Sequence, residues 1–276
     1  MEGRGAATAL PLRLANRPAF QRPAGVRGGL TVFKPVVVIP VYNHPDTIPA
    51  VCAAVRAHGL ECILVDDGSD GRTQAAVQRL AVHDLGVHRL RLATNQGKGA
   101  AMVAGFREAA RRGFTHVLQV DADGQHDTGD IPQFIEQARL HPDAVIAGCP
   151  VYDASVPKGR LYGRYATHVW VWINTLSLDI RDSMCGFRAY PLASLMPLLE
   201  KVRIGRRMDF DSDVIVRLHW RGVPVVNLAT RVTYPQDGIS HFRMLRDNVR
   251  ISAMHTRLFF GMLARLPMLL WRKVAA

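Results

Sequence analysis

Acidic side chains stand directly behind two apolar runs of this sequence. Asp66 and Asp67 follow "CILV", and Asp121 and Asp123 follow "VLQV". Two aspartates at positions i and i+2 can point toward one ion from a bent loop, and carboxylate oxygens suit Mg²⁺ or Mn²⁺, especially when phosphates complete the shell. "DADG" is also typical of a solvated turn. Two acidic strand ends side by side would repel each other without a cation or hydrogen-bonding ligand between them, so the pattern favours a metal site.

A basic loop opens the helix that we predict after the third strand. "NQGKGAA" (95–101) places glycines and Lys98 where a helix N-terminus would meet phosphates. The loop is not a Walker motif, because GxxxxGK[ST] is absent, and no GxGxxG follows the first strand. The loop therefore indicates phosphate binding without an ordinary dinucleotide fold.

The elements that would hold these residues alternate along the chain. Apolar, β-branched runs predict strands at 35–43, 61–69, 87–95, 115–124 and 143–151, and helical spacing predicts helices at 46–59, 71–86, 98–113 and 130–142. We expect an α/β fold with a mainly parallel sheet and helices on both faces. Ligands of such sheets bind at the carboxyl ends of the strands, where the acidic pairs and Tyr42-Asn43 stand.

Composition limits the classes of partner. The 276 residues carry a formal charge of +12, which favours an anionic partner, and the hydrophobic content of 48% excludes wholesale disorder. We expect no nucleic acid as partner, because RNA-binding aromatic motifs, zinc fingers and helix-turn-helix signatures are absent, although a basic nucleic-acid-binding protein stays an alternative. The four cysteines form no CxxC pair and are expected to be buried free thiols, as in a reducing compartment.

A family resemblance follows from four motifs in series. "VVVIPVYNHPDTI", "ILVDDGSDGRT", "NQGKGAAMVAG" and "VLQVDADGQHD" resemble, in order and spacing, the nucleotide-sugar half of inverting family 2 glycosyltransferases with a GT-A fold. "DIRDSMCGFRAYP", "FDSDVIVRLHWRGVPV" and "GISHFR" are similar to the branch of dolichol- and polyprenyl-phosphate sugar synthases. The resemblance covers residues 35–243. A nucleotidyltransferase of similar fold is the main alternative, but "PVYNHPD" stands where such enzymes carry a glycine-rich basic loop.

The resemblance implies a role for each motif. A GDP- or UDP-sugar would be the donor, and the residues that would contact it are Pro40, Tyr42, Asn43, Asp66, Asp67, Lys98, Asp121 and Ala122. Asp121 and Asp123 would bind Mg²⁺ or Mn²⁺, with Gln125 as a further ligand. Asp127 is expected to start a turn or helix and not to bind the metal.

The acceptor is implied to be lipid-linked, with polyprenyl phosphate favoured. A phosphate acceptor is already an anion and needs cationic partners instead of a general base. Candidates for acceptor binding are Arg160, Arg164, Arg188, Ser240, His241 and Arg243. A hydroxyl acceptor remains open, because relatives usually carry Ser-Lys at Ser240-His241. Asp182 or Asp213 would then be the catalytic base, although Asp213 equally suits a helix-capping role. Asp209 and Asp211 are expected to be exposed helix-start acids.

The two ends of the chain differ from its centre. We expect a basic, disordered arm over 1–33, a GT-A domain over 34–243 and amphipathic helices over 244–276, divided at Pro267. On one continuous helix the C-terminal arginines would fall within an arc of about 100°. The segment either lies on an anionic membrane surface, on its cytoplasmic face, or packs on the core with a basic outer side.

Overall fold

The computed structural model describes residues 32–151, 158–232 and 244–275. In this part of the chain a seven-stranded sheet has the order β3-β2-β1-β4-β6-β5-β7. The strands are β1 Pro35–Val41, β2 Cys62–Asp67, β3 Val87–Leu92, β4 His116–Gln119, β5 Val145–Val151, β6 Arg188–Pro191 and β7 Val225–Arg231. β6 is antiparallel to both of its neighbours, and the other pairs are parallel.

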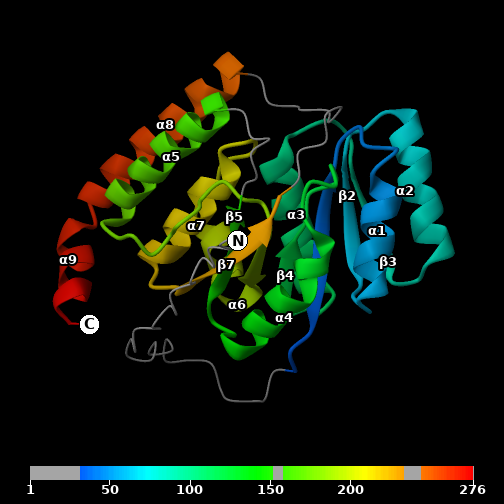
Figure 1. The fold of residues 1–276 in the computed structure, drawn as a ribbon, viewed down its shortest axis with the longest axis horizontal. Coiled ribbons are helices and arrows are strands. Elements are labelled where there is room, and N and C mark those ends of the chain that lie inside the picture. Colours follow the sequence, from blue (N-terminus) through cyan, green and yellow to red (C-terminus); the bar gives the residue numbers. More distant parts are fainter. Residues whose placement is uncertain (1–31, 152–157, 233–243, 276) are drawn as a thin grey trace, which may run out of the picture.

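Helices cover both faces of this sheet (Figure 1). The helices are α1 Ile48–Ala57, α2 Gly71–His83, α3 Lys98–Arg111, α4 Ile131–Leu140, α5 Lys158–Thr175, α6 Leu192–Lys201, α7 Phe210–Trp220, α8 Met244–Leu263 and α9 Leu266–Val274. The buried residues of α1, α2 and α4 belong to one hydrophobic core cluster. The buried residues of α3 and of α5–α9 belong to the other, larger cluster. The prediction of a mainly parallel α/β sheet with helices on both faces is thereby confirmed.

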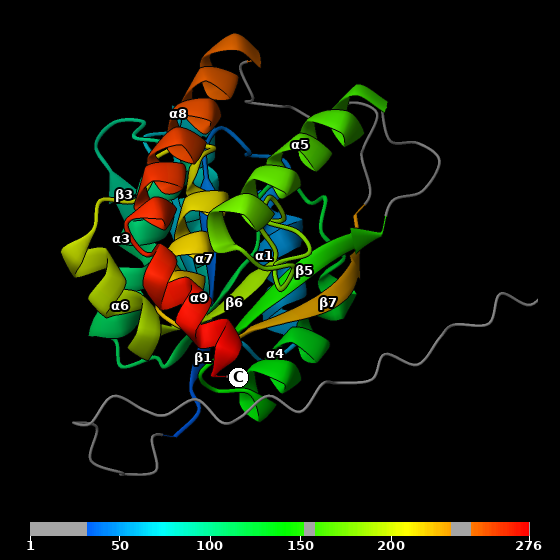
Figure 2. The same ribbon diagram turned by 90° about the vertical axis from the view of Figure 1, so that its left-hand side faces the viewer.

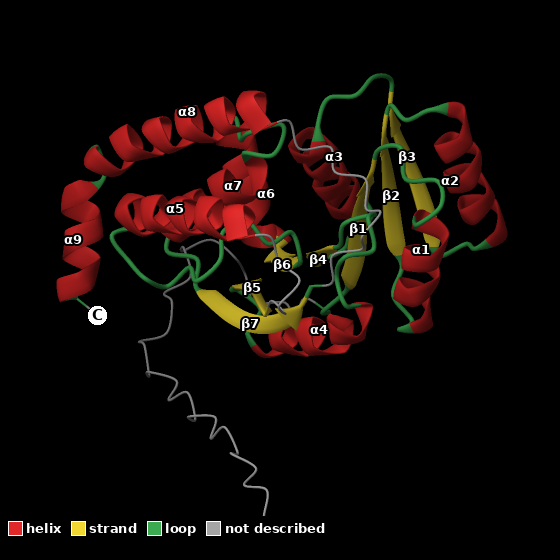
Figure 3. Cartoon of the chain, turned by 45° about the horizontal axis from the view of Figure 1, so that its top comes forward, coloured by secondary structure: helices red, strands yellow, loops and turns green. Residues whose placement is uncertain are grey.

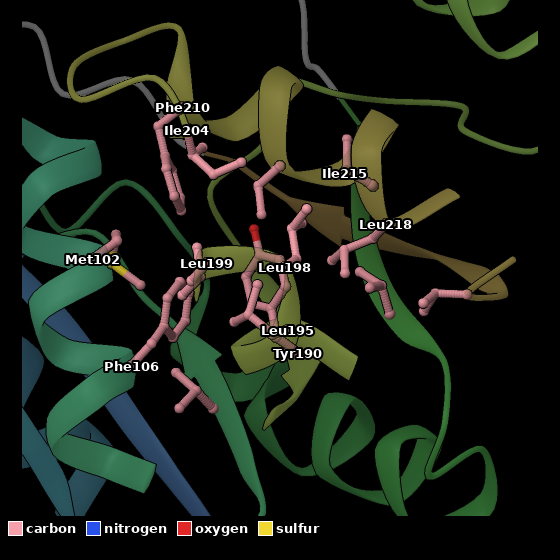
Figure 4. Packing of buried hydrophobic residues seen from close by; sticks show 14 of the residues in the cluster. Met102, Phe106, Tyr190, Leu195, Leu198, Leu199, Ile204, Phe210, Ile215 and Leu218 are labelled. Carbon is pink, nitrogen blue, oxygen red and sulfur yellow. The ribbon is translucent and has the colours of Figure 1, made fainter. Parts of the chain in front are cut away.

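Continuous apolar runs explain the central strands. The first four residues after Pro35 in β1 are buried, as is every residue of β2, because helices lie on both faces. At the sheet edge, β3 alternates between more and less buried residues, which matches its "VHRLRL" sequence. On the larger core cluster, the rings of Phe106 and Tyr190 meet edge to face with centroids 5.2 Å apart (Figure 4).

The C-terminal helices pack on the domain. α8 runs beside α5 in Figures 2 and 3, and the two helices are in contact. Met254, Leu258, Met262 and Leu269 are buried in the larger core cluster. The break at Pro267 is confirmed, because Pro267 occupies the first turn of α9. No helix in the described ranges is long and apolar enough to cross a membrane.

The cysteines and the N-terminal arm were also predicted from the sequence. All four cysteines are free thiols, as predicted, and three are buried, whereas Cys149 is half-buried. The predicted basic arm lies outside the described residues except for Val32 and Phe33.

Candidate active site

The carboxyl ends of β1, β2 and β4 meet at one edge of the sheet. Val41 of β1 pairs with Asp66 of β2, and Val38 pairs with Gln119 of β4. Asp121 follows β4 by two residues, so the acidic segments predicted from sequence lie on neighbouring strands. The helix α3 begins beside them at Lys98. The sheet therefore brings the metal and phosphate candidates together, as the spacing predicts.

Lys98 and two carboxylates form the centre of the site. The Lys98 Nζ lies 2.9 Å from each Asp121 oxygen and 3.0 Å from Oδ2 of Asp211. Burial opposes the charge of Lys98, but Asp121 and Asp211 together raise the pKa of its ammonium. Burial would likewise raise the pKa of Asp121, yet Lys98 and His126 outweigh it and hold that pKa well below its usual range. Lys98 and Asp121 are therefore both charged near neutral pH.

A glycine makes room for this cluster. A Cβ atom at Gly186 would lie 2.5 Å from Oδ2 of Asp121 and 2.8 Å from Nζ of Lys98, both closer than real Cβ contacts. The same atom would lie 3.0 Å from Nε2 of Gln119. Gly186 precedes β6 by two residues, so the antiparallel strand supplies one wall of the site. Any side chain at this position would displace the charged centre.

The turn after Asp121 offers further oxygen ligands. Asp123 accepts a hydrogen bond of 3.0 Å from the backbone N–H of Gln125 through Oδ1. Burial, with the neighbouring Asp121 as a second cause, raises the pKa of Asp123. Asp127 caps the short 3-10 turn Thr128–Asp130 by accepting from Gly129 at 2.9 Å, which confirms its prediction as a turn residue.

A divalent cation fits this donor set. Oδ1 of Asp121 is buried with the Lys98 ammonium 2.9 Å away, and of the two Asp123 oxygens only Oδ1 accepts a backbone hydrogen bond in the described part of the chain. Within residues 32–151, 158–232 and 244–275, no three His, Cys, Asp or Glu residues are arranged to hold a metal by themselves. Two carboxylates that need phosphate oxygens to complete the shell are typical of Mg²⁺ sites.

The acids after β2 hold the surrounding loops. Both oxygens of Asp67 accept from the loop 95–97, at 2.7 Å from Gln96 N, 2.7 Å from Gly97 N and 3.0 Å from Asn95 Nδ2. Burial raises the pKa of Asp67, against these backbone hydrogen bonds. Asp66 accepts from Ser69 N at 2.8 Å and pairs with Arg91. Asp67 thereby fixes the loop that directly precedes Lys98, and Asp66 fixes the turn after β2.

The residues predicted after β1 and β4 lie at the same edge. Asn43 adopts a left-handed backbone (φ 55°) and its Oδ1 accepts from Asp70 N at 2.9 Å, which ties the end of β1 to the turn after β2. Pro40 is a partner of Val65 in the sheet, and Tyr42 follows β1. The buried Ala122 accepts a hydrogen bond of 2.6 Å from Thr47 through its carbonyl.

Asp211 is a site residue that was not predicted. The prediction of exposed helix-start acids is wrong, because Asp209 and Asp211 are only 7% and 6% exposed. Oδ1 of Asp211 accepts from Gln119 Nε2 at 3.0 Å, while Oδ2 faces Lys98. Residues 210–216 are all buried, so α7 is covered on every side. An apolar run such as "VIV" directly behind these acids was the available signal, because a helix that is apolar all round is buried with its first turn.

Asp213 has a structural contact instead of the predicted catalytic one. Its Oδ1 accepts from Arg217 at 2.5 Å and its Oδ2 accepts from Gly205 N at 2.9 Å. The side chain is 1% exposed. With both oxygens occupied inside the core, Asp213 anchors the segment before α7, which favours its predicted structural role at the helix start over its predicted role as a base.

Asp182 and Arg164 likewise bind each other. Arg164 donates two hydrogen bonds of 2.6 Å to the Asp182 carboxylate, and the N–H groups of Met184 and Cys185 donate to its Oδ1. Burial alone would raise the pKa of Asp182, but His168 and Arg164 hold it far below its usual range. Such a carboxylate is a poor general base, which argues against the predicted catalytic role of Asp182, whereas the acceptor role of Arg164 stays a prediction.

The remaining acceptor candidates fall into two groups. Arg188 is fully buried, with Nη1 donating to the Asp211 carbonyl at 2.6 Å, so it supports α7 from below and its predicted acceptor role is corrected. Arg160 lies in α5, but its side chain is outside the described part. Ser240, His241 and Arg243 lie outside the described residues.

Comparison with known proteins agrees with this geometry. The model of glycosyl transferase family 2 matches residues 36–195. Polyprenol monophosphomannose synthase of Mycolicibacterium smegmatis is 29% identical over 254 residues, which cover 84% of this chain and 88% of that protein. Undecaprenyl-phosphate mannosyltransferase of Micrococcus luteus is 29% identical over 202 residues, with 70% and 81% covered.

Solved structures agree on the fold. Glucosyl-3-phosphoglycerate synthase of Mycobacterium tuberculosis, crystallised with Mn²⁺ and UDP-glucose, aligns with a TM-score of 0.61 and 16% identity over 85% of this chain and 79% of that chain. At 16% identity, this structural similarity is evidence for a shared fold only. The family match displaces the nucleotidyltransferase and nucleic-acid-binding alternatives. Because the family model spans more than half of the sequence, the chain belongs to glycosyl transferase family 2 and has its GT-A-type fold.

Proposed function

We propose that this chain transfers a sugar from a nucleotide diphosphate sugar to polyprenyl phosphate, with inversion at the anomeric carbon. The two mannosyltransferase relatives support this acceptor class by their names. The observation that carries the proposal is the charged centre of Lys98, Asp121 and Asp211 beside Asp123, at the carboxyl edge of the sheet.

Donor binding rests on the residues around that centre. Asp121, Asp123 and Gln125 would hold Mg²⁺ or Mn²⁺, whose charge would stabilise the departing nucleotide diphosphate. Lys98 would donate to a phosphate oxygen at the N-terminus of α3. Pro40, Tyr42, Asn43, Asp66, Asp67 and Ala122 would surround the nucleoside. Either a GDP- or a UDP-sugar fits this arrangement.

The state of the predicted bases supports a phosphate acceptor. Asp182 is paired with Arg164 and Asp213 with Arg217, so neither carboxylate is available to remove a proton from a hydroxyl. An acceptor phosphate oxygen is already negative and needs no base. It would attack the anomeric carbon opposite the leaving diphosphate, so that one C–O bond forms as the other breaks. Arg160, Arg164, Ser240, His241 and Arg243 remain our candidates for holding that phosphate.

A membrane surface is the proposed source of the acceptor. α5 exposes Tyr165, Val169, Trp170 and Ile173, which recur at helical spacing, and α8 exposes Met244, Leu245, Val249, Phe260 and Leu263. The rings of Trp170 and Phe259, 6.3 Å apart, join the two helices. Exposed apolar stripes beside basic residues favour binding to an anionic interface. We assign the protein to the cytoplasmic face, where nucleotide sugars would reach the site.

A transfer assay tests this function. Purified protein is incubated with labelled GDP-mannose or UDP-glucose and detergent-dispersed undecaprenyl phosphate, with Mn²⁺ or with EDTA. We expect label in the lipid with at least one donor, and none after metal removal. Undecaprenol is the matched acceptor control, since it offers a hydroxyl on the same chain. Transfer to undecaprenol but not to its phosphate would refute the phosphate acceptor.

A further inference from the structure

A cleft lies beside the candidate active site, on the side of α8. It has a volume of about 470 Å³, within the range of small-molecule sites. Its walls come from the loop after β3, the segment before α7 and the middle of α8. Four arginines line it, namely Arg206, Arg207, Arg250 and Arg257. Arg250 and Arg257, two of the C-terminal arginines predicted to face lipid headgroups, therefore face this cleft.

The cleft carries an excess of positive charge. Asp209 is the acid among its lining residues, and its Oδ2 lies 3.9 Å from Nη2 of Arg257. Arg250 pairs with Asp247 at 3.1 Å outside the lining. Four guanidinium groups against these two carboxylates leave a charge of 4 − 2 = +2, which Asp67, interacting with Arg207 across the loop 95–97, offsets in part. Like charges held together in a concave surface are unfavourable unless an anion joins them.

Two of the arginines are oriented by neutral amides. Nη1 of Arg207 donates to Oδ1 of Asn95 at 2.9 Å, and Nη2 of Arg206 donates to Oε1 of Gln96. These bonds fix each guanidinium without cancelling its charge. Each guanidinium has five N–H donors in a planar fork that matches the oxygens of phosphate, so further donors remain for a ligand.

A wall of backbone separates this cleft from the nucleotide side. Asp67 accepts from Gln96 N and Gly97 N on one side of the loop 95–97, while Arg207 binds Asn95 on the other. A Cβ at Gly97 would lie 2.4 Å from Cγ of Arg207, so the arginine packs directly on the loop. None of Lys98, Asp121 and Asp211 lines the cleft.

We propose that this cleft is a second anion site, which binds a diphosphate or phosphomonoester group carrying at least two negative charges. Its volume exceeds what one phosphate fills, and no aromatic residue lines it to stack on a base. The ligand chemistry is therefore that of the phosphate itself. Free phosphate compounds and phosphate headgroups of lipids both present it. The site is additional to the donor and acceptor sites of the proposed function.

Calorimetry on the full chain tests the site. Sodium pyrophosphate is titrated in EDTA, so that binding through a divalent cation at Asp121 and Asp123 does not contribute. The test variant is Arg250→Gln/Arg257→Gln. The control is Arg79→Gln/Arg246→Gln, which removes the same charge from exposed positions outside the cleft. Charged hydrogen bonds of typical strength predict at least a tenfold weaker binding for the test variant, and less than a twofold change for the control.

A second arm distinguishes the source of the phosphate. Sedimentation is compared for phosphatidylcholine vesicles with and without phosphatidic acid. If the test variant loses pyrophosphate binding, the site takes soluble phosphates; if it loses only the phosphatidic-acid-dependent binding, the site takes lipid headgroups. Equal behaviour of the two double variants in both arms overturns the proposal. Sugar transfer is measured separately, so failure of the proposed function would not be confused with failure of this site.

Discussion

Asp211, in the first turn of α7, lies 3.0 Å from the ammonium of Lys98 in the first turn of α3. The two residues are 113 positions apart, and their contact joins the nucleotide side of the sheet to the later part of the chain. The N-terminal end of α7 favours the negative Asp211, whereas the N-terminal end of α3 disfavours a positive Lys98. The two carboxylates around Lys98 therefore stabilise its charge at this helix end.

Removal of the Lys98 charge should destabilise the protein. In Lys98→Met the carboxylates of Asp121 and Asp211 lose their common cation inside a partly buried site. We expect the free energy of unfolding at pH 7 to fall by about 3 kcal/mol. Lys98 lowers the folded-state pKa of Asp121, so its stabilisation is present above the unfolded value and is lost as pH falls through the folded one.

Urea denaturation at several pH values measures this effect. The difference between wild type and Lys98→Met should stay nearly constant from pH 7 to about 5 and should shrink below about pH 4, where carboxyl groups of unfolded chains take up protons while the folded Asp121 stays ionised. Lys201→Met, at the exposed end of α6, is the matched control and should stay within about 0.5 kcal/mol of wild type. A pH-independent difference would show that Lys98 acts through packing alone.

Asp123→Asn should abolish sugar transfer while leaving the fold intact. An amide oxygen is a weaker ligand for a hard cation than a carboxylate, so we expect at least a 10²-fold loss of kcat/KM and weaker Mn²⁺-dependent binding of nucleotide diphosphate. Calorimetry with and without EDTA measures the binding. Asp127→Asn, which affects only the cap of the short turn, should retain transfer. If the nucleotide binds with equal affinity with and without EDTA, a divalent cation has no role in donor binding.

Gly186→Ala should inactivate the site through one methyl group. The added Cβ would lie 2.5 Å from Asp121 and 2.8 Å from Lys98, so both side chains must move from their present positions. We expect a 10- to 10²-fold loss of kcat, roughly that of a misplaced catalytic group. Thermal denaturation should change little, because both side chains have flexible ends. Gly71→Ala is the control, since no atom lies within 4 Å of its Cβ, and full activity of Gly186→Ala would contradict this packing.

The sequence predicted the nucleotide side of the fold better than the rest. β1 and β2 are apolar runs followed by turn residues, so their local pattern was enough to predict where these strands lie. The same pattern predicted the sheet edge at which Asp66 and Asp121 lie. The antiparallel β6 and the long helix α5 were missed. Four buried residues of β6 give no period, and the exposed apolar residues of α5 blur its amphipathic pattern.

The misassigned site residues share one cause. Asp182, Asp211 and Arg188 owe their roles to partners far away in the sequence, and a linear pattern does not say which acid meets which base. Asp211 faces Lys98 because α7 packs against α3, whereas Asp182 is neutralised by Arg164 of α5. Spacing thus predicts which residue types gather at a sheet edge, but long-range packing decides which of them stay free for a ligand.

Acid should weaken the pairing of α5 with α8. His255 of α8 is stacked on Trp170 and lies 3.3 Å from Nδ2 of Asn174, and burial lowers its pKa to about 4. Between pH 6.5 and 4 the unfolded state binds the proton and the folded state does not, so stability falls as pH is lowered. The expected loss from pH 7 to pH 5 is about 2 kcal/mol more than in His255→Gln.

Hydrogen exchange locates this effect. In the wild type, after correction for intrinsic rates, the amides of α5 and α8 should exchange faster at pH 5 than at pH 7. The amides of β1 and β2 should exchange at the same corrected rate at both pH values. His58→Gln, at an exposed position, is the matched histidine control and should keep the wild-type pH dependence. If His255→Gln shows the same pH dependence as well, another group carries the transition.

Two apolar residues of α8 should determine membrane binding. Leu245 and Val249 are 82% and 60% exposed, and both contribute to an apolar surface at the start of this helix. Leu245→Glu/Val249→Glu should reduce sedimentation with anionic liposomes at least tenfold, because buried leucine and valine each contribute about 1.5–3 kcal/mol. Deletion of 258–276 would be a poorer test, since Leu258 and Met262 belong to the core.

Val82→Glu/Leu85→Glu, near the end of α2, is the matched control. It adds the same charges at exposed apolar positions on the other side of the domain (Figure 1) and should bind like wild type. Equal losses in both variants would mean that net charge, and not the surface of α8, governs binding.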